Sequence, residues 1–252
     1  MTHSINPAEL VDFHCHLDLY PNYLEIVRES ETLGIKTLTV TNAPCVWKQN
    51  QMLIKDCKHI RVALGLHPQL VHVKAKEIEL FEQLLPETRY VGEVGLDNAP
   101  EYADSIAIQR QVFQKILELC ASMTGKVLTV HSRRASRQVI ELIGNYLPPE
   151  KGRVVLHWFT GSMKEAMIAV ELGCYFSINI KMLETPRKRE LVESLPKERI
   201  LTESDGPFVK FGKKIICPKD MWKPVQELAG IWSESEANAA KIIRNNLKIL
   251  LS

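Results

Sequence analysis

The 252-residue sequence lacks a strong net charge, closely spaced cysteines and any long apolar run. A net charge of only +2 excludes a generally basic surface as the source of nucleic-acid affinity, so such affinity would need a local patch or a metal. The six cysteines form no C-x-x-C pair, and most lie in apolar stretches, as free thiols do in a reducing cytosol. The first twenty residues contain no cationic start and no apolar segment long enough for a signal or membrane helix. We therefore expect a soluble cytoplasmic protein.

The sequence also lacks a Gly/Ser linker, a low-complexity tract and an obvious short repeat. Because 252 residues with 45% apolar content can form one hydrophobic core, we expect a single domain over residues 1–252. Residues 1–9 are predicted to be a loose N-terminal arm, and residues 206–218 (GPFVKFGKKIICP) a long loop after the last strand. Residues 219–251 are predicted to form the closing helices.

Short stretches typical of strands alternate along the chain with segments whose apolar residues recur at helical spacing. The predicted helices include residues 22–33, 74–85, 104–123, 134–146, 163–172 and 186–195. The eight predicted strands are residues 10–15, 36–41, 60–66, 90–95, 127–131, 153–158, 174–179 and 199–203. This alternation favours an α/β fold consisting of a single (β/α)8 barrel, of the TIM-like type, over an open doubly wound sheet.

The sharpest local pattern is the pair His14 and His16 in VDFHCHLD, at the end of the first predicted strand. Alternate residues of a strand face the same side, so both imidazoles and Asp12 point one way, and two neutral imidazoles can bind one divalent ion. An isolated H-x-H pattern is also compatible with ordinary polar residues at a strand end. Its place at the carboxyl end of the strand favours the functional interpretation, because barrels hold their active sites on that face.

Four further side chains of metal-binding type lie at the carboxyl ends of other predicted strands. Taken singly, each is more often a hydrogen-bonded polar residue than a ligand. Together with His14 and His16 they occupy the ends of five different strands, and this common position and the restriction to His, Glu and Asp indicate a metal centre instead. The full candidate set is His14, His16, Glu93, His131, His157 and Asp205.

Six donors exceed what one tetrahedral ion needs, so we expect two divalent ions, with Mg, Mn and Zn all compatible with mixed histidine and carboxylate ligands. Two ions close together can activate a water molecule and stabilise the leaving oxygen of an in-line displacement, as phosphodiester cleavage requires. The pattern therefore predicts a metal-dependent hydrolase whose substrate is a nucleic acid.

Six ordered motifs resemble those of the TatD family of metal-dependent deoxyribonucleases. They run from about residue 11 to residue 207 and are HCHLD at 14–18, GLHP at 65–68, GEVGLD at 92–97, HSR at 131–133, HWFTGS at 157–162 and ESDGP at 203–207. The resemblance implies a TIM-like barrel that hydrolyses DNA, often as a 3′ to 5′ exonuclease.

The resemblance also implies roles for the candidate ligands: His14 and His16 bind one ion with Asp205 close by, and Glu93 bridges both ions. His131 and His157 complete the second ion's set. Details such as HLDLYPN, ALGLHPQL, LPETRYVGE and HSRRA are similar to the TatD-type nuclease of the Qat anti-phage system, which implies partners from a defence operon.

The chain departs from the family pattern in three places. Asn98, Ala99 and Pro100 follow GEVGLD where many members carry aromatic residues, Gly206 replaces the usual Ala or Ser, and the stretch after residue 207 differs. These departures concern substrate shape and exonuclease polarity rather than the ligands.

Several further residues are candidates for supporting roles. Asp205 is expected to be the general base as well as a ligand, with Glu93 the second catalytic carboxylate. Glu203 could orient a ligand imidazole, or it could be a barrel-interior carboxylate paired with a cation. Asp12 is expected in the same supporting shell.

Two residues are expected to bind the substrate. His67 could donate to a phosphate oxygen or could simply cap the backbone before Pro68, whereas the forked guanidinium of Arg133 suits phosphate better. Three lysines could form a basic lip, although a charge run is usually only solvated, and neighbouring aromatics could stack on a base or pack in the core. These residues are Lys210, Lys213, Lys214, Trp158, Phe159 and Phe208.

Two other functions fit parts of the sequence. Barrel amidohydrolases that open cyclic amides or lactones also begin with H-x-H, but they often bridge their ions with a carboxylated lysine on the fourth strand. Here that strand, YVGEVG, offers Glu93 and no lysine, which favours the nuclease. The third interpretation is a metal-bound subunit of a defence complex with little activity alone. A nuclease acting on single-stranded or frayed DNA remains the prediction.

Overall fold

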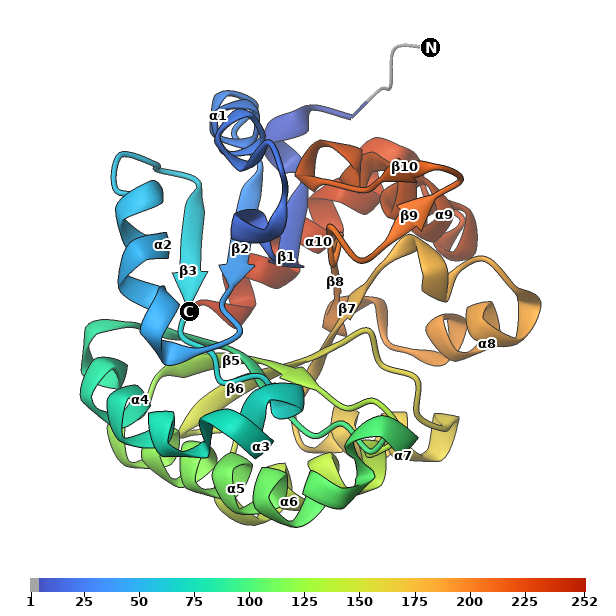
Figure 1. Cartoon of the computed structure of the whole chain (residues 1–252). Helices are drawn as coiled ribbons and strands as arrows, with labels where there is room; N and C mark the ends of the chain where they lie inside the picture. Colours follow the sequence, from blue (N-terminus) through green and yellow to red (C-terminus); the bar gives the residue numbers. More distant parts are fainter. Residues whose placement is uncertain (1–4) are drawn as a thin grey trace. The chain divides into compact units, whose positions relative to one another are not determined.

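The computed structural model describes residues 5–252. The eight predicted strands are all present, as β1 (Val11–Cys15), β2 (Lys36–Val40), β3 (Ile60–Ala63), β4 (Tyr90–Gly95), β5 (Lys126–His131), β6 (Gly152–His157), β7 (Tyr175–Ile178) and β8 (Ile200–Thr202). The α-helices are α1 (Tyr23–Thr32), α2 (Trp47–Leu53), α3 (Val71–Lys74), α4 (Ile78–Leu84), α5 (Ile106–Met123), α6 (Ser136–Tyr146), α7 (Met163–Glu171), α8 (Pro186–Ser194), α9 (Trp222–Trp232) and α10 (Glu236–Leu250). Strands and helices alternate along the chain, as the sequence predicts (Figure 1).

The chain forms two compact units, each built from separate stretches of sequence. Unit 1 comprises residues 1–39, 54–61 and 176–252, and unit 2 comprises residues 40–53 and 62–175. Each unit contains parallel strands with helices packed beside them. The predicted closing helices are present in unit 1 as α9 and α10.

In unit 1, β1 pairs in parallel with β2, and β7 pairs in parallel with β8. The first and last of the eight barrel strands also lie side by side: the N–H of Asp205 donates to the carbonyl of His14 at 2.9 Å, and Thr202 Oγ1 donates to the carbonyl of Val11 at 2.5 Å. This neighbourhood of first and last strands is typical of a (β/α) barrel. Helix α10 contacts both strands and buries an apolar face against them.

In unit 2, β4, β5 and β6 form consecutive parallel pairs, with β5 in the middle. Helices α4, α5 and α6 lie beside these strands (Figure 1). The amphipathic pattern explains the packing of α6, whose buried face includes Val139, Ile140 and Ile143. Helix α7 begins with a capping box, in which Ser162 Oγ accepts from the N–H of Glu165 at 3.3 Å and the N–H of Ser162 donates to the Glu165 carboxylate at 2.7 Å.

Two segments differ from the expected description. The predicted long loop 206–218 contains a small antiparallel hairpin, β9 (Lys210–Phe211) and β10 (Lys214–Ile215). The predicted arm includes a 3-10 helix at Pro7–Glu9 and a buried Ile5, while residues 1–4 lie outside the described residues. Short-range hydrogen bonding, which apolar periodicity does not report, produces both features. Within residues 5–252, no helix combines the length and the apolar character needed to cross a membrane.

Candidate metal centre

Strand β1 and the segment after β8 bring His14, His16 and Asp205 together in unit 1; we call these three residues the His14 cluster. All three are buried. The Nε2 atoms of His14 and His16 lie 3.8 and 3.6 Å from the same carboxylate oxygen of Asp205. These separations exceed a hydrogen bond and approach the roughly 3.4 Å expected between two ligands of one tetrahedral ion at ordinary zinc distances. The spacing of the donors therefore suits a divalent ion.

The backbone holds Asp205 in an uncommon conformation, with φ at 44°. Aspartate tolerates this left-handed region better than most residues, although the conformation still costs on the order of 1 kcal/mol. Hydrogen bonds on both sides maintain it: the Asp205 N–H donates to His14, and the Asp205 carbonyl accepts from the N–H of Phe208 at 3.0 Å and of Val209 at 3.2 Å. The bend turns the carboxylate toward the two histidines.

Asp12, on the same strand β1, contacts the backbone that precedes Asp205. Its Oδ1 accepts the backbone N–H of Ser204, the residue before Asp205, at 2.8 Å. Burial raises the pKa of Asp12 to about 7, because burial outweighs the hydrogen bonds from Ser204 that favour the charged form. Asp12 thus contacts the backbone that positions Asp205, as its predicted supporting role requires.

Glu203 is fully buried and accepts hydrogen bonds from Ser177 Oγ and from Asn179 Nδ2, the latter at 2.9 Å. A carboxylate oxygen of Glu203 also lies within 4.8 Å of a ring nitrogen of His14. Neutral donors on β7 and on the residue after it therefore fix this carboxylate beside a candidate ligand. The role of Glu203 in orienting His14 stays a prediction.

The glycine at position 206, one of the departures from the family pattern, has a steric cause. A Cβ atom at this position would lie 1.6 Å from the hydroxyl oxygen of Tyr20 and 2.3 Å from the carbonyl oxygen of Ile216. The Tyr20 hydroxyl donates to that same carbonyl at 2.5 Å, so the space is filled by a hydrogen bond. Only glycine fits between them.

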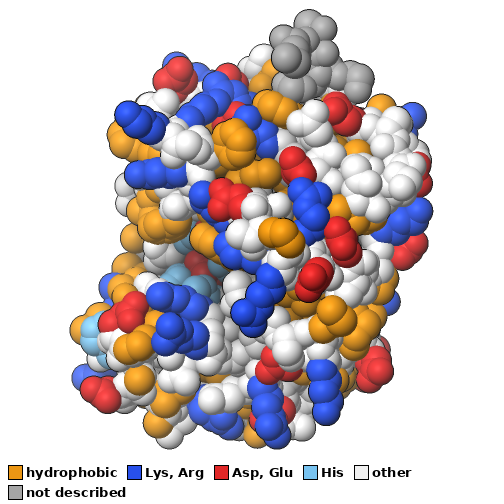
Figure 2. Space-filling model, turned by 90° about the vertical axis from the view of Figure 1, so that its right-hand side faces the viewer, with side chains coloured by type: hydrophobic (Ala, Val, Ile, Leu, Met, Phe, Trp, Pro, Cys, Tyr) orange, Lys and Arg blue, Asp and Glu red, His pale blue; other side chains and the backbone are white. Residues whose placement is uncertain are grey.

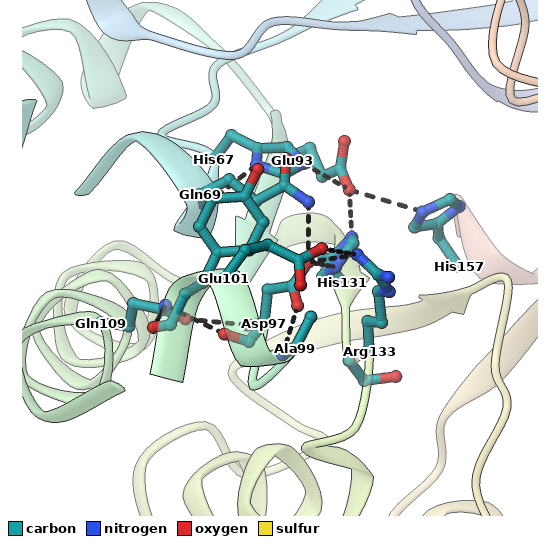
Figure 3. Close-up of polar contacts among 12 residues, drawn as sticks. His67, Gln69, Glu93, Asp97, Ala99, Glu101, Gln109, His131, Arg133 and His157 are labelled. Atoms are coloured by element: carbon teal, nitrogen blue, oxygen red, sulfur yellow. Dashed lines mark hydrogen bonds and ion pairs between the residues drawn. The ribbon is translucent and has the colours of Figure 1, made fainter. Parts of the chain in front are cut away.

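The second group of donors lies in unit 2 and centres on one carboxylate oxygen; we call His67, Glu93, His131 and His157 the Glu93 cluster (Figure 3). Glu93 Oε1 lies 2.6 Å from His131 Nδ1, 3.2 Å from His67 Nε2 and 3.4 Å from His157 Nε2. Glycine at 95 permits the close approach of β4 to β5, because a Cβ there would lie 2.1 Å from the carbonyl oxygen of His131. Three imidazoles thus share one buried carboxylate.

His131 makes hydrogen bonds through both ring nitrogens, to Glu93 at 2.6 Å and to Asp97 at 3.1 Å. Both partners are carboxyl groups, so both contacts favour a proton on the ring nitrogen that faces them. Burial lowers the pKa of His131, but the hydrogen bonds to Asp97 and Glu93 outweigh it and raise that pKa above its usual value. We therefore expect an ion that binds His131 to compete with a proton for that ring.

The contacts of His67 indicate its tautomer. Its Nδ1 accepts the backbone N–H of Gln69 at 3.1 Å, so the neutral ring carries its proton on Nε2, which faces Glu93. A metal ligand would need a lone pair at that nitrogen. His67 therefore acts as a hydrogen-bond donor, which leaves His131, His157 and Glu93 as the candidate ligands of the cluster.

Asp97 belongs to this site although the sequence reasoning did not single it out. It accepts from Gln69 Nε2 at 2.7 Å and from the N–H of Ala99 at 2.9 Å, and its own N–H donates to Gln109 at 2.8 Å (Figure 3). Burial alone would raise the pKa of Asp97, but the hydrogen bonds, led by that from His131, lower it to about 2. The available signal was its position two residues past β4, the same strand-end rule that found Glu93.

Arg133, the predicted phosphate contact, is half-exposed, and its guanidinium donates to Glu101 at 3.2 Å, with Asp97 at 3.8 Å. The group thus lies near the Glu93 cluster but faces two carboxylates (Figure 3). A phosphate would have to compete with Glu101, so the binding role of Arg133 stays a prediction.

The predicted aromatic residues and lysines differ from one another in exposure and in pairing. Phe159 is buried and packs in the core, whereas Phe208 is 59% exposed. Lys214 pairs with Asp220 at 2.8 Å, while Lys210 and Lys213 are exposed.

Both clusters satisfy the chemistry of a divalent-ion site, since each combines at least two imidazoles with a carboxylate among mostly buried side chains. Asp205, His14 and His16 come from unit 1, and the Glu93 cluster comes from unit 2. Among residues 5–252, the groups whose donor atoms all lie within 4.8 Å of one another include His14, His16 and Asp205, and His67, Glu93 and His131.

Comparison with known proteins identifies the family. Residues 11–252 match the model of the TatD related DNase family. A metal-dependent hydrolase of Methanocaldococcus jannaschii is 27% identical, with 96% of each chain covered, and the 3′-5′ ssDNA/RNA exonuclease TatD of Edwardsiella piscicida is 31% identical over 72% of this chain and 74% of its own. The crystal structure of YjjV, a TatD homologue from Escherichia coli K12, superposes with a TM-score of 0.85 at 22% identity over 97% of this chain and 98% of that one, which confirms the predicted fold class. The chain therefore belongs to the TatD related DNase family and is a metal-dependent hydrolase.

Proposed function

We propose that the chain is a phosphodiesterase that hydrolyses DNA at single-stranded or frayed ends with the help of two divalent ions. The observation that carries the proposal is the pair of donor clusters, one around Asp205 and one around Glu93, each formed at the carboxyl ends of parallel strands. The family match and the names of relatives, which include a 3′-5′ ssDNA/RNA exonuclease, support a nucleic-acid substrate. The family match over residues 11–252 also supports one domain.

In this proposal His14, His16 and Asp205 hold one ion, and Glu93, His131 and His157 hold the other. The bridging role of Glu93 that the family resemblance implies stays a prediction. Bound divalent ions lower the pKa of water and neutralise charge on a phosphate. Asp205 accepts the proton of the attacking water, because its carboxylate is buried and turned into the site by its backbone conformation. Water oxygen then bonds to phosphorus, the ester bond breaks, and the leaving oxygen takes up a proton.

Supporting residues keep these donors in place. Glu203 orients His14, Asp12 fixes the backbone before Asp205, and His67 donates to Glu93. Holding each ligand through a second hydrogen bond typically contributes 10- to 100-fold in metal affinity or activity.

The test combines metal analysis with digestion of end-labelled DNA. We expect about two ions per chain, hydrolysis supported by Mg, Mn or Zn, and complete loss of hydrolysis with a chelator. His14→Ala with His16→Ala should lose one ion and at least about 100-fold in rate, and Glu93→Gln should lose the other ion. His72→Ala is the matched control, because His72 is an exposed histidine outside both clusters.

Two results would reject the proposal. One is unchanged DNA hydrolysis in the double histidine variant. The other is turnover of a cyclic amide or lactone panel by an enzyme that leaves single-stranded DNA intact, which would identify an amidohydrolase.

We further propose a cytoplasmic role in anti-phage defence, together with other proteins of a defence operon. The stretches HLDLYPN, ALGLHPQL, LPETRYVGE and HSRRA support this role, and six free cysteines suit a reducing compartment. Phage plating on bacteria that carry the operon with wild-type chain or with Asp205→Asn tests it: equal protection by both would reject a catalytic contribution.

A further inference from the structure

The segment after Asp205 forms a hairpin that the metal chemistry does not use; we call residues 208–215 the hairpin platform. Strand β9 pairs with β10 through Phe211 opposite Lys214 and Lys210 opposite Ile215. Gly212 has φ at 60° at the first position of the two-residue turn, a place that favours glycine in tight hairpins. The platform belongs to unit 1, like the His14 cluster.

The base of the hairpin platform is anchored beside the catalytic carboxylate. Val209 and Ile216 are each 1% exposed, and the N–H of Ile216 donates to the carbonyl of Val209 at 3.1 Å. The carbonyl of Asp205 accepts the N–H of Phe208 at 3.0 Å, and the Tyr20 hydroxyl donates to Ile216. These contacts fix the start of the hairpin relative to Asp205.

Two phenylalanines project from this anchored base into solvent. Phe208 is 59% exposed and Phe211 is 49% exposed. The Phe208 ring meets the ring of His16 edge-on, with centroids 5.1 Å apart and an interplanar angle of 83°. Lys223 Nζ lies 4.6 Å from the centroid of Phe211. An exposed aromatic ring therefore contacts a candidate metal ligand directly.

The charge of the segment suits an anionic strand. Residues 206–218 contain three lysines and no acidic residue. Lys214 pairs with Asp220, whereas Lys210 and Lys213 are exposed and make no ion pair within residues 5–252. On the face drawn in Figure 2, Lys and Arg side chains are mixed with Asp and Glu, so that face presents no continuous basic surface. Lys210 and Lys213 thus form a small local group of exposed lysines on the hairpin.

We propose that the hairpin platform binds single-stranded DNA, with a base stacked on Phe208 and with Lys210 and Lys213 bound to neighbouring phosphates. The proposal rests on the proposed nuclease function and names the surface that delivers the strand to the His14 cluster. Single strands fit because their bases expose flat faces for stacking, and stacking beside lysines is the usual means of binding them without sequence preference. A duplex hides those faces.

The experiment measures binding rather than turnover. Metal-loaded full-length chain is titrated against fluorescent phosphorothioate oligodeoxythymidine, which resists hydrolysis, at several salt concentrations. Phe208→Leu keeps apolar bulk but removes the ring face and should weaken binding about 5- to 100-fold, whereas Phe208→Trp should keep binding within about threefold of wild type. Ile249→Ala is the matched control, since Ile249 is 50% exposed on α10.

The lysines are tested through the salt dependence. Lys210→Gln with Lys213→Gln should reduce the slope of log affinity against log salt by about 1.4, at about 0.7 for each phosphate released. Lys241→Gln with Lys248→Gln removes the same charge from exposed positions on α10 and should leave the slope unchanged. Metal content and thermal unfolding of every variant show whether the fold is kept.

The outcomes separate this proposal from the nuclease proposal. Wild-type binding with no hydrolysis of ordinary DNA would reject the nuclease and keep the platform. The platform proposal would be wrong if Phe208→Leu hydrolysed DNA and still bound the oligonucleotide as tightly as wild type. It would also be wrong if the two lysine pairs gave equal salt slopes. Tighter binding of the matching oligouridine, or of duplex, would overturn the assignment to single-stranded DNA. If Phe208→Leu fails to fold, the lysine pair decides the question.

Discussion

The His14 cluster and the Glu93 cluster use the same side-chain types but are in different states. In the His14 cluster the carboxylate of Asp205 lies 3.6 and 3.8 Å from the two imidazoles, which is beyond hydrogen-bond length. In the Glu93 cluster the carboxylate makes a 2.6 Å hydrogen bond to His131. The donors of the His14 cluster already have the spacing of ligands around an ion, whereas Glu93 and His131 are in direct hydrogen-bond contact.

Because of this difference, we expect the two clusters to respond differently when an ion binds. We expect the His14 cluster to take an ion with little rearrangement, because the backbone and the neighbouring carboxylates of Asp12 and Glu203 hold its donors. Because the pKa of His131 is raised, we expect ion binding to the Glu93 cluster to compete with protonation of His131 and to lengthen its contact with Glu93. We therefore expect the His14 cluster to load first and the Glu93 cluster to respond to pH.

The largest expected effect comes from Asp205→Asn, which keeps the shape of the side chain but removes its charge. Because the variant cannot accept the proton of water, we expect the turnover number to fall about 10²- to 10⁴-fold. Binding of the resistant oligonucleotide should persist, because the hairpin platform is anchored by the backbone of Asp205. Single-turnover digestion and fluorescence titration measure the two properties. Turnover within tenfold of wild type would refute the role of general base.

A smaller effect is expected for Asp97→Asn, which should change ion binding at the Glu93 cluster alone. Asp97 holds one ring nitrogen of His131, so its loss should weaken ion binding to that cluster about 10- to 100-fold while the His14 cluster keeps its affinity. Calorimetric metal titration at alkaline pH measures both sites, and the imidazole NMR signals of the metal-free protein report the orientation of His131. Asp104→Asn, at an exposed position nearby, is the control. An equal loss of ion affinity at both clusters would show that Asp97 does not act on the Glu93 cluster alone.

The pH dependence of metal loading should then distinguish the clusters. The pKa of His131 is raised, so below that pKa each pH unit should weaken ion binding to the Glu93 cluster by up to about tenfold. Above the raised pKa the affinity should level off. Titrations of the double variant His14→Ala with His16→Ala, in buffers of different ionisation enthalpy, measure the protons released. Release of no proton at neutral pH would show that His131 is not the group that the ion displaces.

The smallest effect on turnover is expected for Asp12→Asn, whose main effect is on stability. The folded-state pKa of Asp12 is about 7 against 3.8 for the ordinary group, so the folded protein keeps a proton that the unfolded chain loses. The contribution of Asp12 to stability therefore falls as pH rises from about 4 to 7, by at most about 4 kcal/mol. Asp12→Asn removes this dependence, so the variant should gain stability relative to wild type across that range.

Denaturant unfolding of the metal-free protein at pH 5 and pH 8 tests this expectation. Asp56→Asn, at an exposed position, is the control for loss of a carboxylate. A stability difference between wild type and Asp12→Asn that does not change with pH would show that Asp12 is charged in the fold.

The sequence predicted the strands well because their signal is local. Eight apolar stretches form β1 to β8, with ends within three residues of the prediction. The position of His14, His16 and Asp205 at strand ends correctly predicted that they lie together. Helix α2 was missed, because its sequence WKQNQML has a weak apolar period. The hairpin within 206–218 was missed because two-residue strands carry no periodic signal.

Side-chain hydrogen bonds were the least predictable part of the site. The sequence left open whether His67 contacts a phosphate or caps the backbone, and only the bond from the Gln69 N–H to its Nδ1 shows which nitrogen carries the proton. Asp97 met the strand-end rule but was passed over, since its importance depends on contacts with Gln69 and Gln109 from distant segments. Such networks depend on exact orientations that spacing along the chain does not encode.

The contact between Tyr20 and Gly206 limits how this chain can diverge. A methyl group at position 206 collides with both the Tyr20 hydroxyl and the backbone carbonyl of Ile216, so an alanine or serine here needs a smaller side chain at position 20 and also a shift of the backbone at Ile216. Replacing Tyr20 also removes its hydrogen bond to the carbonyl of Ile216, the residue that follows the hairpin platform. Grafting a relative's loop onto this protein therefore requires the exchange of position 20 in the same step.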